Sequence, residues 1–486
     1  MCSLWLIFYQ YLVLMKKIVL CWAVCIVSLM ATAQNTQKEK IEVVKQKVVR
    51  YFNAYQPDSI YTLAGNAFRK QLSEEAFRKI FENNLAPLGI LNADEFESME
   101  GNVAKYKAVF AASTFSMYLS LDSAGQIETF LFQPYKKPVT GPLIKSITDN
   151  KLLSDQDKKV EEVLQKFMFE SQAVALSIGV LKNGQLFYYN YGETVKGNKQ
   201  LPSNKNLYEI GSVTKTFTGI LLAKAVNEGK IKLNDPVNLY LPKDAAWLVY
   251  DSDTARIVHL SNHTSGLPPL PDNFDMTNMV NPYKDYDEAK LLTYLHHAKL
   301  QRKPGEKLEY CNLGVGLLGY ILSTVYKMPF EKMVSNFITS KAGMTDTKEF
   351  LLKKDSALFI QGYNEALQQQ GPWDFKVLTA AGSLRSNTSD LLKYAAVNLN
   401  CNDPELQKAI SLSHKVTYEA GKQKIGLNWF IQNWGWGDIY FHNGATGGYR
   451  TFLAINPVTK TAVVLLCNTF VNVDEAGVSL MKTLDK

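Results

Sequence analysis

The sequence predicts a mixed α/β chain of the α+β kind, with a small domain ahead of a larger one. In residues 36–134 helical periodicity comes first and strand-like alternation follows, which is typical of an α+β domain. Residues 154–486 carry strand patterns near both ends, with helix-rich sequence between them. Residues 135–153 contain two X-Pro bonds and a glycine, so we expect a linker there.

The N-terminus predicts a signal peptide over residues 1–33. Met15 opens a second hydrophobic stretch with two lysines at its start, an apolar centre and an Ala-x-Ala site ending at Ala33. We therefore expect translation to begin at Met15, cleavage to follow Ala33, and the mature protein to be periplasmic or secreted. The alternative is an uncleaved membrane anchor that begins at Met1.

The small domain should begin with helices and end with a sheet. Its first segment places five apolar residues on one helical face: Ile41, Val44, Val48, Tyr51 and Phe52. Ser73, followed by two glutamates, is a good N-cap for a second helix. Strands are expected over 103–110, 115–121 and 127–132. The pattern resembles the cone-shaped domains of the nuclear transport factor type, and we expect a non-catalytic role: ligand holder, dimerisation module or spacer.

The larger domain opens with a helix near 154–168 and a hairpin over 174–191, whose turn is Asn183-Gly184. Apolar residues along one face predict a further helix between Gly211 and Gly229. Strands return at four places before a final helix: 425–432, 438–441, 449–455 and 461–466.

The most informative motif lies at the start of that central helix. Ser212 and Lys215 are three residues apart, so their side chains share a helix face. A serine hydroxyl needs a neighbouring base at neutral pH, and a buried lysine loses its charge readily enough to help. The motif alone is weak evidence, because ordinary helices produce this spacing often.

Two further motifs follow in order, Tyr310-Cys311-Asn312 and His442-Asn443-Gly444. Together the three segments resemble the serine β-lactamase and penicillin-binding protein superfamily. Tyr-x-Asn and His-x-Gly point to its branch of class C β-lactamases, D-alanyl-D-alanine carboxypeptidases and related esterases. The stretches 259–268 and 381–391 fit the same branch, so the likeness runs from about residue 155 to the C-terminus.

The resemblance implies one antiparallel sheet flanked by helices, with an all-helical lobe beside it and the active site between them. It also implies that Ser212 becomes acylated, while Lys215 and Tyr310 share the proton transfers. Which of the two is the base stays open. A tyrosine base requires a depressed pKa, for which Lys215 is the expected cause.

The remaining site residues are also implied by the resemblance. Asn312 would hold the substrate amide and orient Lys215. The backbone N–H groups of Ser212 and Ala445 would form the oxyanion hole. Gly444 would let the substrate backbone approach the strand edge.

Departures from the family pattern bear on the substrate. His442 and Asn443 stand where many relatives carry the lysine and threonine that hold a substrate carboxylate. A mostly neutral histidine weakens that hold, although Arg450 is a candidate replacement. We therefore expect peptidase or esterase activity ahead of true β-lactamase activity.

No metal or cofactor is expected. His259 and His263 have the spacing of a zinc pair, but no glutamate follows His259 and no third ligand stands out, so a structural loop near the site is the better interpretation. Cys311 raises the alternative of a cysteine hydrolase, but a residue between two site-facing neighbours usually points away from the site. We expect it to be a bystander.

The sequence thus predicts a serine hydrolase that forms an acyl-enzyme with a D-amino-acid peptide, a cell-wall fragment or a small ester or amide. The alternative is a non-catalytic sensor of penicillins or cell-wall peptides on the same scaffold. The expected partner is a small-molecule or peptide substrate, with membrane contact only through the signal or anchor segment. The formal net charge of +7 is spread along the chain and gives no nucleic-acid signal. The oligomeric state stays open.

Overall fold

The computed structural model describes residues 37–110, 114–135, 144–275 and 280–485. The chain divides into two compact units between Pro138 and Val139. The predicted signal peptide and residues 136–143 of the predicted linker lie outside the described residues.

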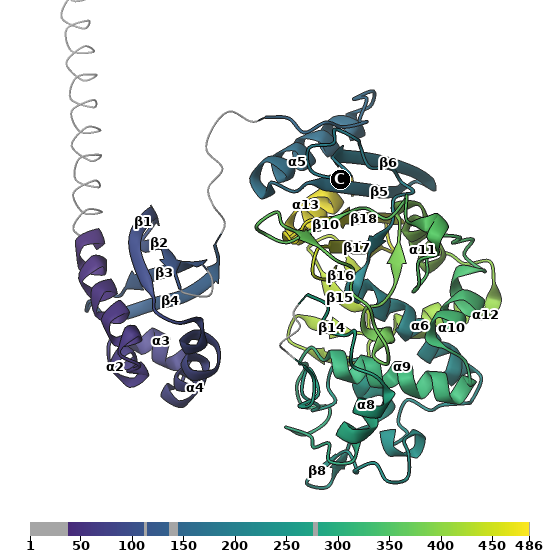
Figure 1. The fold of residues 1–486 in the computed structure, drawn as a ribbon, viewed down its shortest axis with the longest axis horizontal. Coiled ribbons are helices and arrows are strands. Elements are labelled where there is room, and N and C mark those ends of the chain that lie inside the picture. The colour runs from purple at the N-terminus through teal and green to yellow at the C-terminus, as the bar shows by residue number, and fades with distance from the viewer. Residues whose placement is uncertain (1–36, 111–113, 136–143, 276–279, 486) are drawn as a thin grey trace, which may run out of the picture. The chain divides into compact units, whose positions relative to one another are not determined.

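The first unit is a layer of helices packed on a four-stranded antiparallel sheet in the order β1-β2-β3-β4 (Figure 1). A helix over 37–53 contributes three of the apolar residues predicted to share a face, Ile41, Val48 and Phe52, to a core with the sheet residues Tyr106 and Met117. The other elements are α2 (Pro57–Thr62), α3 (Asn66–Gln71), α4 (Glu74–Ile80), η1 (Phe81–Leu85), η2 (Ala86–Leu88), β1 (Asn92–Glu100), β2 (Val103–Val109), β3 (Thr114–Leu121) and β4 (Ile127–Pro134).

The helix-then-sheet prediction for this unit is confirmed, with one strand missed. Ser73 caps α4 as expected, because its hydroxyl accepts the Ala76 N–H at 3.3 Å. The missed strand is β1, whose sequence is rich in acidic residues that are depleted in strands. Its place at the sheet edge tolerates those charges, and Glu95 pairs there with Lys107 at 2.8 Å.

The second unit is built on an eight-stranded antiparallel sheet in the order β13-β14-β15-β16-β17-β18-β5-β6. The strands are β5 (Ala175–Lys182), β6 (Gln185–Gly192), β13 (Tyr418–Ala420), β14 (Gln423–Ile425), β15 (Phe430–Asn433), β16 (Asp438–Ala445), β17 (Arg450–Asn456) and β18 (Thr461–Cys467). Pairing of β18 with β5 joins the late strands to the early hairpin, so the expectation of one antiparallel sheet built from both ends is confirmed. The predicted strand 425–432 is broken, since 426–429 leave the sheet between β14 and β15.

Helices cover both faces of this sheet. Helices α5 (Asp155–Ser171) and α13 (Asp474–Leu484) pack together on one face (Figure 1). Helix α11 (Thr388–Leu399) packs on the other, and helix α6 (Thr214–Asn227) joins the same core beyond it.

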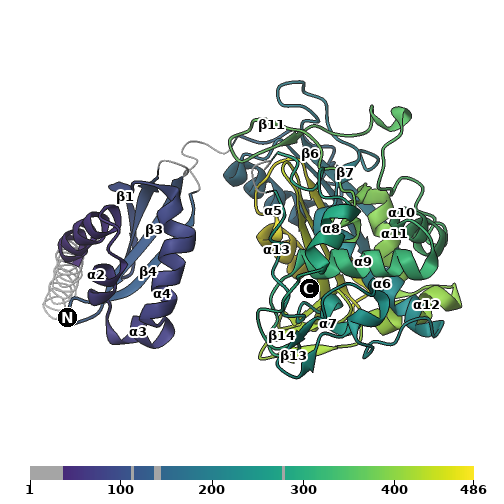
Figure 2. The ribbon, with the colours of Figure 1, turned by 60° about the horizontal axis from the view of Figure 1, so that its bottom comes forward.

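The all-helical lobe lies beside the sheet, with α6 and α9 (Asn312–Tyr326) packed against each other at its centre (Figure 2). The remaining helices are α7 (Ile257–Ser261), α8 (Glu288–Leu295), α10 (Phe330–Val334) and α12 (Pro404–Ser413). Short helical turns and two-residue strands complete the unit: η3 (Gly211–Val213), η4 (Val237–Tyr240), η5 (Ser335–Thr339), η6 (Lys353–Asp355), η7 (Thr379–Ala381), β7 (Tyr208–Glu209), β8 (Val249–Tyr250), β9 (Asp253–Thr254), β10 (Gly362–Tyr363), β11 (Gln369–Gln370) and β12 (Arg385–Ser386).

In the described part of the chain no single helix is long and apolar enough to cross a membrane. One bent pair, Asn312–Tyr326 with Phe330–Thr339, passes that test by length and composition. Most of the apolar side chains of this pair belong to the hydrophobic core of the second unit, which is the simpler reason for their composition.

Part of the predicted linker packs onto the large unit instead of standing free. The Ile147 carbonyl accepts the Gly192 N–H at 2.9 Å, and the Asp149 carboxylate accepts the Asn190 N–H at 2.8 Å. Residues 146–150 therefore extend the edge of the sheet beside β6.

Candidate active site

Ser212 and Lys215 lie together at the junction of the turn η3 and helix α6. The Lys215 amine donates to the Ser212 hydroxyl at 2.9 Å and to the Ala381 carbonyl at 2.5 Å. The Lys215 side chain is fully buried, whereas Ser212 is half-buried. The predicted nucleophile is therefore in direct contact with the predicted base.

Burial sets the protonation state of Lys215. Loss of solvent lowers its pKa from 10.5 to about 7, and no carboxylate among the described residues offsets this effect. A lysine with such a pKa is neutral in a large fraction of molecules at pH 7 and can accept a proton from Ser212.

Ala381 is a site residue that the sequence did not identify. It ends the turn η7, which is fastened to α6 by two further bonds: Thr218 donates to the Ala380 carbonyl at 2.9 Å, and the Thr214 hydroxyl accepts the Leu384 N–H at 3.2 Å. The contribution of Ala381 is a backbone carbonyl, which has no residue-type signature. The stretch 381–391 matched the family, but the pattern gave no role to its first residue.

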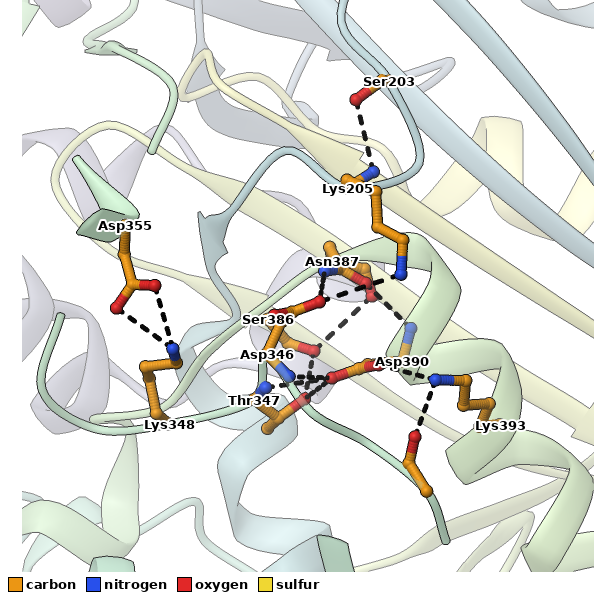
Figure 3. Close-up of polar contacts among 11 residues, drawn as sticks. Ser203, Lys205, Asp346, Thr347, Lys348, Asp355, Ser386, Asn387, Asp390 and Lys393 are labelled. Atoms are coloured by element: carbon orange, nitrogen blue, oxygen red, sulfur yellow. Dashed lines mark hydrogen bonds and ion pairs between the residues drawn. The ribbon is translucent and has the colours of Figure 1, made fainter. Parts of the chain in front are cut away.

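The second half of that stretch is structural (Figure 3). The Asn387 side chain accepts the Asp390 N–H at 2.8 Å and so caps helix α11. The buried Asp390 carboxylate accepts the N–H groups of Asp346 and Thr347 at 2.7 and 3.0 Å. These bonds hold a neighbouring loop against the start of α11, so we assign them to the scaffold that carries Ala381.

Tyr310 lies just before helix α9, with the Lys215 nitrogen 4.9 Å from the centre of its ring. The His263 ring packs against it at 4.5 Å between centroids. Although 37% of the residue is exposed, desolvation of its phenol is the main effect on its pKa and raises it well above 10, while a hydrogen bond with Ser212 opposes this in part. The expectation of a depressed tyrosine pKa is wrong for this state, because the desolvation that raises it also removes much of the charge on Lys215.

Unlike Tyr310, the side chains of Asn312 and Cys311 do not contact Lys215 or Ser212 through a hydrogen bond. The Asn312 amide donates to the Tyr283 hydroxyl at 3.3 Å, and the hydrogen bonds of Lys215 go to Ser212 and Ala381 instead. Asn312 therefore does not orient Lys215 as expected. The buried Cys311 thiol accepts the Gly314 N–H at 3.1 Å as the N-cap of α9, and burial raises its pKa to about 11. A protonated capping thiol is a structural group, in keeping with the bystander interpretation.

The predicted oxyanion-hole residues come together through two glycines. Gly211 has a φ of 48°, and a Cβ at this position would lie 2.7 Å from the Ala445 nitrogen. A Cβ at Gly444 would collide with the Ile210 carbonyl. Gly444 therefore brings strand β16 against the nucleophile turn, and its expected role in admitting the substrate backbone stays a prediction.

His442 lies on the face of β16 that faces Tyr310, 6.3 Å from it between ring centroids. It is fully buried, and its Nδ1 lies 2.6 Å from the Asn443 carbonyl. Burial, and then the charge of Lys215, lower its pKa to about 3. His442 is therefore neutral and supplies no positive charge to a substrate.

Arg450 lies on the opposite face of the sheet. It pairs with Ala445 across β16 and β17, and cross-strand partners share a face that alternates with that of His442. Its guanidinium stacks on Phe470 at 3.9 Å, and Asn443 donates to Asp474 on the same side at 2.6 Å. The structure therefore does not bring Arg450 together with Ser212.

Within the described ranges, no three His, Cys, Asp or Glu side chains form a group that could hold a metal ion. His259 and His263 bond backbone amides instead: His259 Nδ1 accepts the Arg256 N–H and His263 Nδ1 accepts the Cys311 N–H, both at 3.2 Å.

Comparison with known proteins agrees with this geometry. Residues 160–482 match the Beta-lactamase family. A beta-lactamase of Pseudomonas fluorescens is 28% identical over 350 residues, which are 65% of this chain and 94% of that protein. The structure of a beta-lactamase/D-alanine carboxypeptidase from Pseudomonas syringae superposes with a TM-score of 0.60 at 23% identity, covering 68% of this chain and 98% of the other. A D-alanine carboxypeptidase from Burkholderia cenocepacia gives 0.60 at 22% identity, over 68% and 99%.

Proposed function

The chain belongs to the beta-lactamase family of serine hydrolases, and from this premise we propose that it is a periplasmic or secreted enzyme that works through an acyl-enzyme on Ser212. Its substrates would be D-amino-acid peptides, cell-wall fragments or small esters and amides. The observation that carries the proposal is the 2.9 Å hydrogen bond between the amine of a fully buried lysine and the hydroxyl of a half-buried serine.

In the acylation step the neutral Lys215 amine takes the Ser212 proton while the serine oxygen attacks the substrate carbonyl. The carbonyl oxygen gains the negative charge, which the N–H groups of Ser212 and Ala445 would stabilise. The Tyr310 phenol is protonated at neutral pH, so it is suited to give its proton to the leaving group as the tetrahedral intermediate collapses. The Lys215 ammonium can then return a proton to Tyr310.

In the second step water attacks the acyl carbonyl, the acid is released and Ser212 regains its proton. The same groups would act in reverse order, with one proton taken from the water and one returned to the serine oxygen.

The charges near Ser212 support a substrate without a carboxylate, such as a small ester, over a β-lactam or a D-Ala-D-Ala terminus. A penicillin or a D-Ala-D-Ala terminus presents a carboxylate, but His442 is neutral and Arg450 lies on the other face of the sheet. Among the described residues, the basic side chain hydrogen-bonded to Ser212 is Lys215, whose proposed role requires it to be neutral. Because relatives are named beta-lactamase and D-alanine carboxypeptidase, β-lactams and D-Ala-D-Ala peptides should be tested as well.

The test is turnover of p-nitrophenyl acetate, an N-acylated D-Ala-D-Ala peptide and a chromogenic cephalosporin by the mature chain, beside Ser212→Ala. We expect hydrolysis of the ester to exceed that of the peptide and of the cephalosporin, and all enzymatic turnover to disappear in the variant. A stable adduct without turnover would favour the sensor instead. Turnover that survives in Ser212→Ala would overturn the proposal.

A further inference from the structure

His263 contacts the catalytic tyrosine without a role in the proposed reaction. It belongs to the loop between α7 and α8, its side chain is fully buried, and its ring lies 4.5 Å from that of Tyr310. It also has a φ of 59°, in the left-handed region that residues with a Cβ rarely adopt.

Two hydrogen bonds join His263 to the residues on either side of Tyr310. The His263 carbonyl accepts the Glu309 N–H at 2.8 Å, and its Nδ1 accepts the Cys311 N–H at 3.2 Å. One residue therefore fixes the backbone before and after Tyr310 and covers one side of its ring. In the conformation with this left-handed φ, both the carbonyl and the imidazole of His263 reach the segment around Tyr310.

The bond to Cys311 fixes the chemical state of the ring. An Nδ1 atom that accepts an amide proton cannot carry one, so the neutral ring has its proton on Nε2. Burial, and then the neighbouring Lys215 and His442, hold the pKa of His263 well below its usual value and so disfavour protonation further. His263 is thus a fixed neutral acceptor and not a participant in proton transfer.

A histidine in this conformation costs stability, so a purely structural role does not explain it well. Its Nε2 is buried without a hydrogen-bond partner among the described residues, and its backbone is strained. Strain of this kind is kept where the surroundings fix it, and such positions cluster at functional sites.

We propose that His263 is a positioning residue that holds the Tyr310 hydroxyl at Ser212 by bonding the backbone on both sides of the tyrosine. This rests on the proposed function, since it assigns Tyr310 a proton-transfer role. It predicts that loss of the imidazole lowers the rate through Tyr310 and leaves the titration of Lys215 in place.

The test compares His263→Ala with His263→Asn, because the asparagine Oδ1 can occupy the place of Nδ1 and asparagine tolerates the left-handed conformation. We expect His263→Ala to lower kcat/KM for p-nitrophenyl acetate roughly 10- to 100-fold, mostly in kcat, as for a misplaced catalytic group. His263→Asn should stay within about 3-fold of wild type. The matched control is His259→Asn, which alters a histidine of the preceding helix α7 whose Nδ1 also accepts a backbone N–H, and should leave activity unchanged.

A double-mutant cycle separates positioning from general damage. In a Tyr310→Phe background, His263→Ala should lower kcat/KM by a further factor of less than about 2, because the hydroxyl that His263 positions is already absent. An equal loss in both backgrounds, a change in the acidic limb of the pH profile, or His263→Asn as impaired as His263→Ala would overturn the inference.

A second measurement does not depend on turnover. Amide hydrogen exchange in the segment 309–313 should accelerate in His263→Ala and stay near wild type in His263→Asn and His259→Asn. If the wild-type chain hydrolyses nothing, the proposed function fails, and this exchange result alone decides whether His263 holds the segment.

Discussion

The Lys215 amine donates a 2.5 Å hydrogen bond to the backbone carbonyl of Ala381. A carbonyl can accept from a neutral amine as well as from an ammonium, and it carries no charge that would hold the proton on the lysine. This pairing orients Lys215 toward Ser212 while burial lowers its pKa to about 7. A carboxylate at the same place would raise the pKa and remove the base.

The pH dependence of acylation should report Lys215. With a pKa near 7, the amine is protonated in acid and neutral in base, so kcat/KM should rise tenfold per pH unit below 7 and level off above it. Lys215→Arg keeps a charge that is never released, and should lose about 10²–10⁴-fold in kcat/KM at pH 8. The measurement is the pH–rate profile with a neutral ester. A profile flat between pH 5 and 9 would refute the assignment of Lys215 as the base.

Lys215 should also cost stability. Its pKa is about 7 when folded and 10.5 when exposed, so the unfolded chain binds more protons between these values and stability rises with pH across that window. Lys215→Met removes this cost and should stabilise the fold by at most about 4 kcal/mol at pH 7, with the gain shrinking as pH approaches 10.5. Denaturant unfolding at pH 7 and 10 measures the difference. An equal effect at both values would mean that the lysine is not desolvated.

Gly211 should be intolerant of a side chain. Alanine there combines a left-handed backbone with a Cβ 2.7 Å from the Ala445 nitrogen, so Gly211→Ala should cost about 1–3 kcal/mol and about 10²-fold in kcat. The matched control is Gly184→Ala, where φ is 74° and the Cβ meets open space. That variant should lose stability and keep its activity. Equal activity of both variants would contradict the close approach to Ala445.

Cys311→Ser should retain catalysis, because serine can replace the thiol as N-cap of α9. Cys311→Ala loses the cap and should cost about 1 kcal/mol in chemical denaturation, with activity also retained. Loss of turnover in a folded Cys311→Ser protein would instead support the cysteine-hydrolase alternative.

The sequence predicted what depends on residue type and spacing. Ser212 and Lys215 are joined by local helix geometry, and strand alternation with turn signals was enough for most of both sheets. Tyr310 and His442 followed from motif order, which carries information that a single segment lacks.

The remaining features depend on tertiary contacts that residue types do not encode. Ala381 acts through its backbone carbonyl, and Gly444 acts through the close approach of Ile210. The face of the sheet on which Arg450 lies depends on the register of β16 and β17. The pKa of Tyr310 moves opposite to expectation because desolvation outweighs the lowering effect of the hydrogen bond with Ser212. Each of these features depends on which groups become neighbours when β16, α6 and α9 pack together.

The most direct test of the account is mass spectrometry of the mature chain after rapid acid quenching with p-nitrophenyl acetate and with a fluorescent penicillin. We predict one acyl adduct, mapped to the peptide that contains Ser212 and absent in Ser212→Ala. In Lys215→Arg the adduct should accumulate more than in wild type only if the substitution slows deacylation more than acylation. An adduct on another residue, or turnover with Ser212 never modified under conditions where acylation is faster than deacylation, would contradict it.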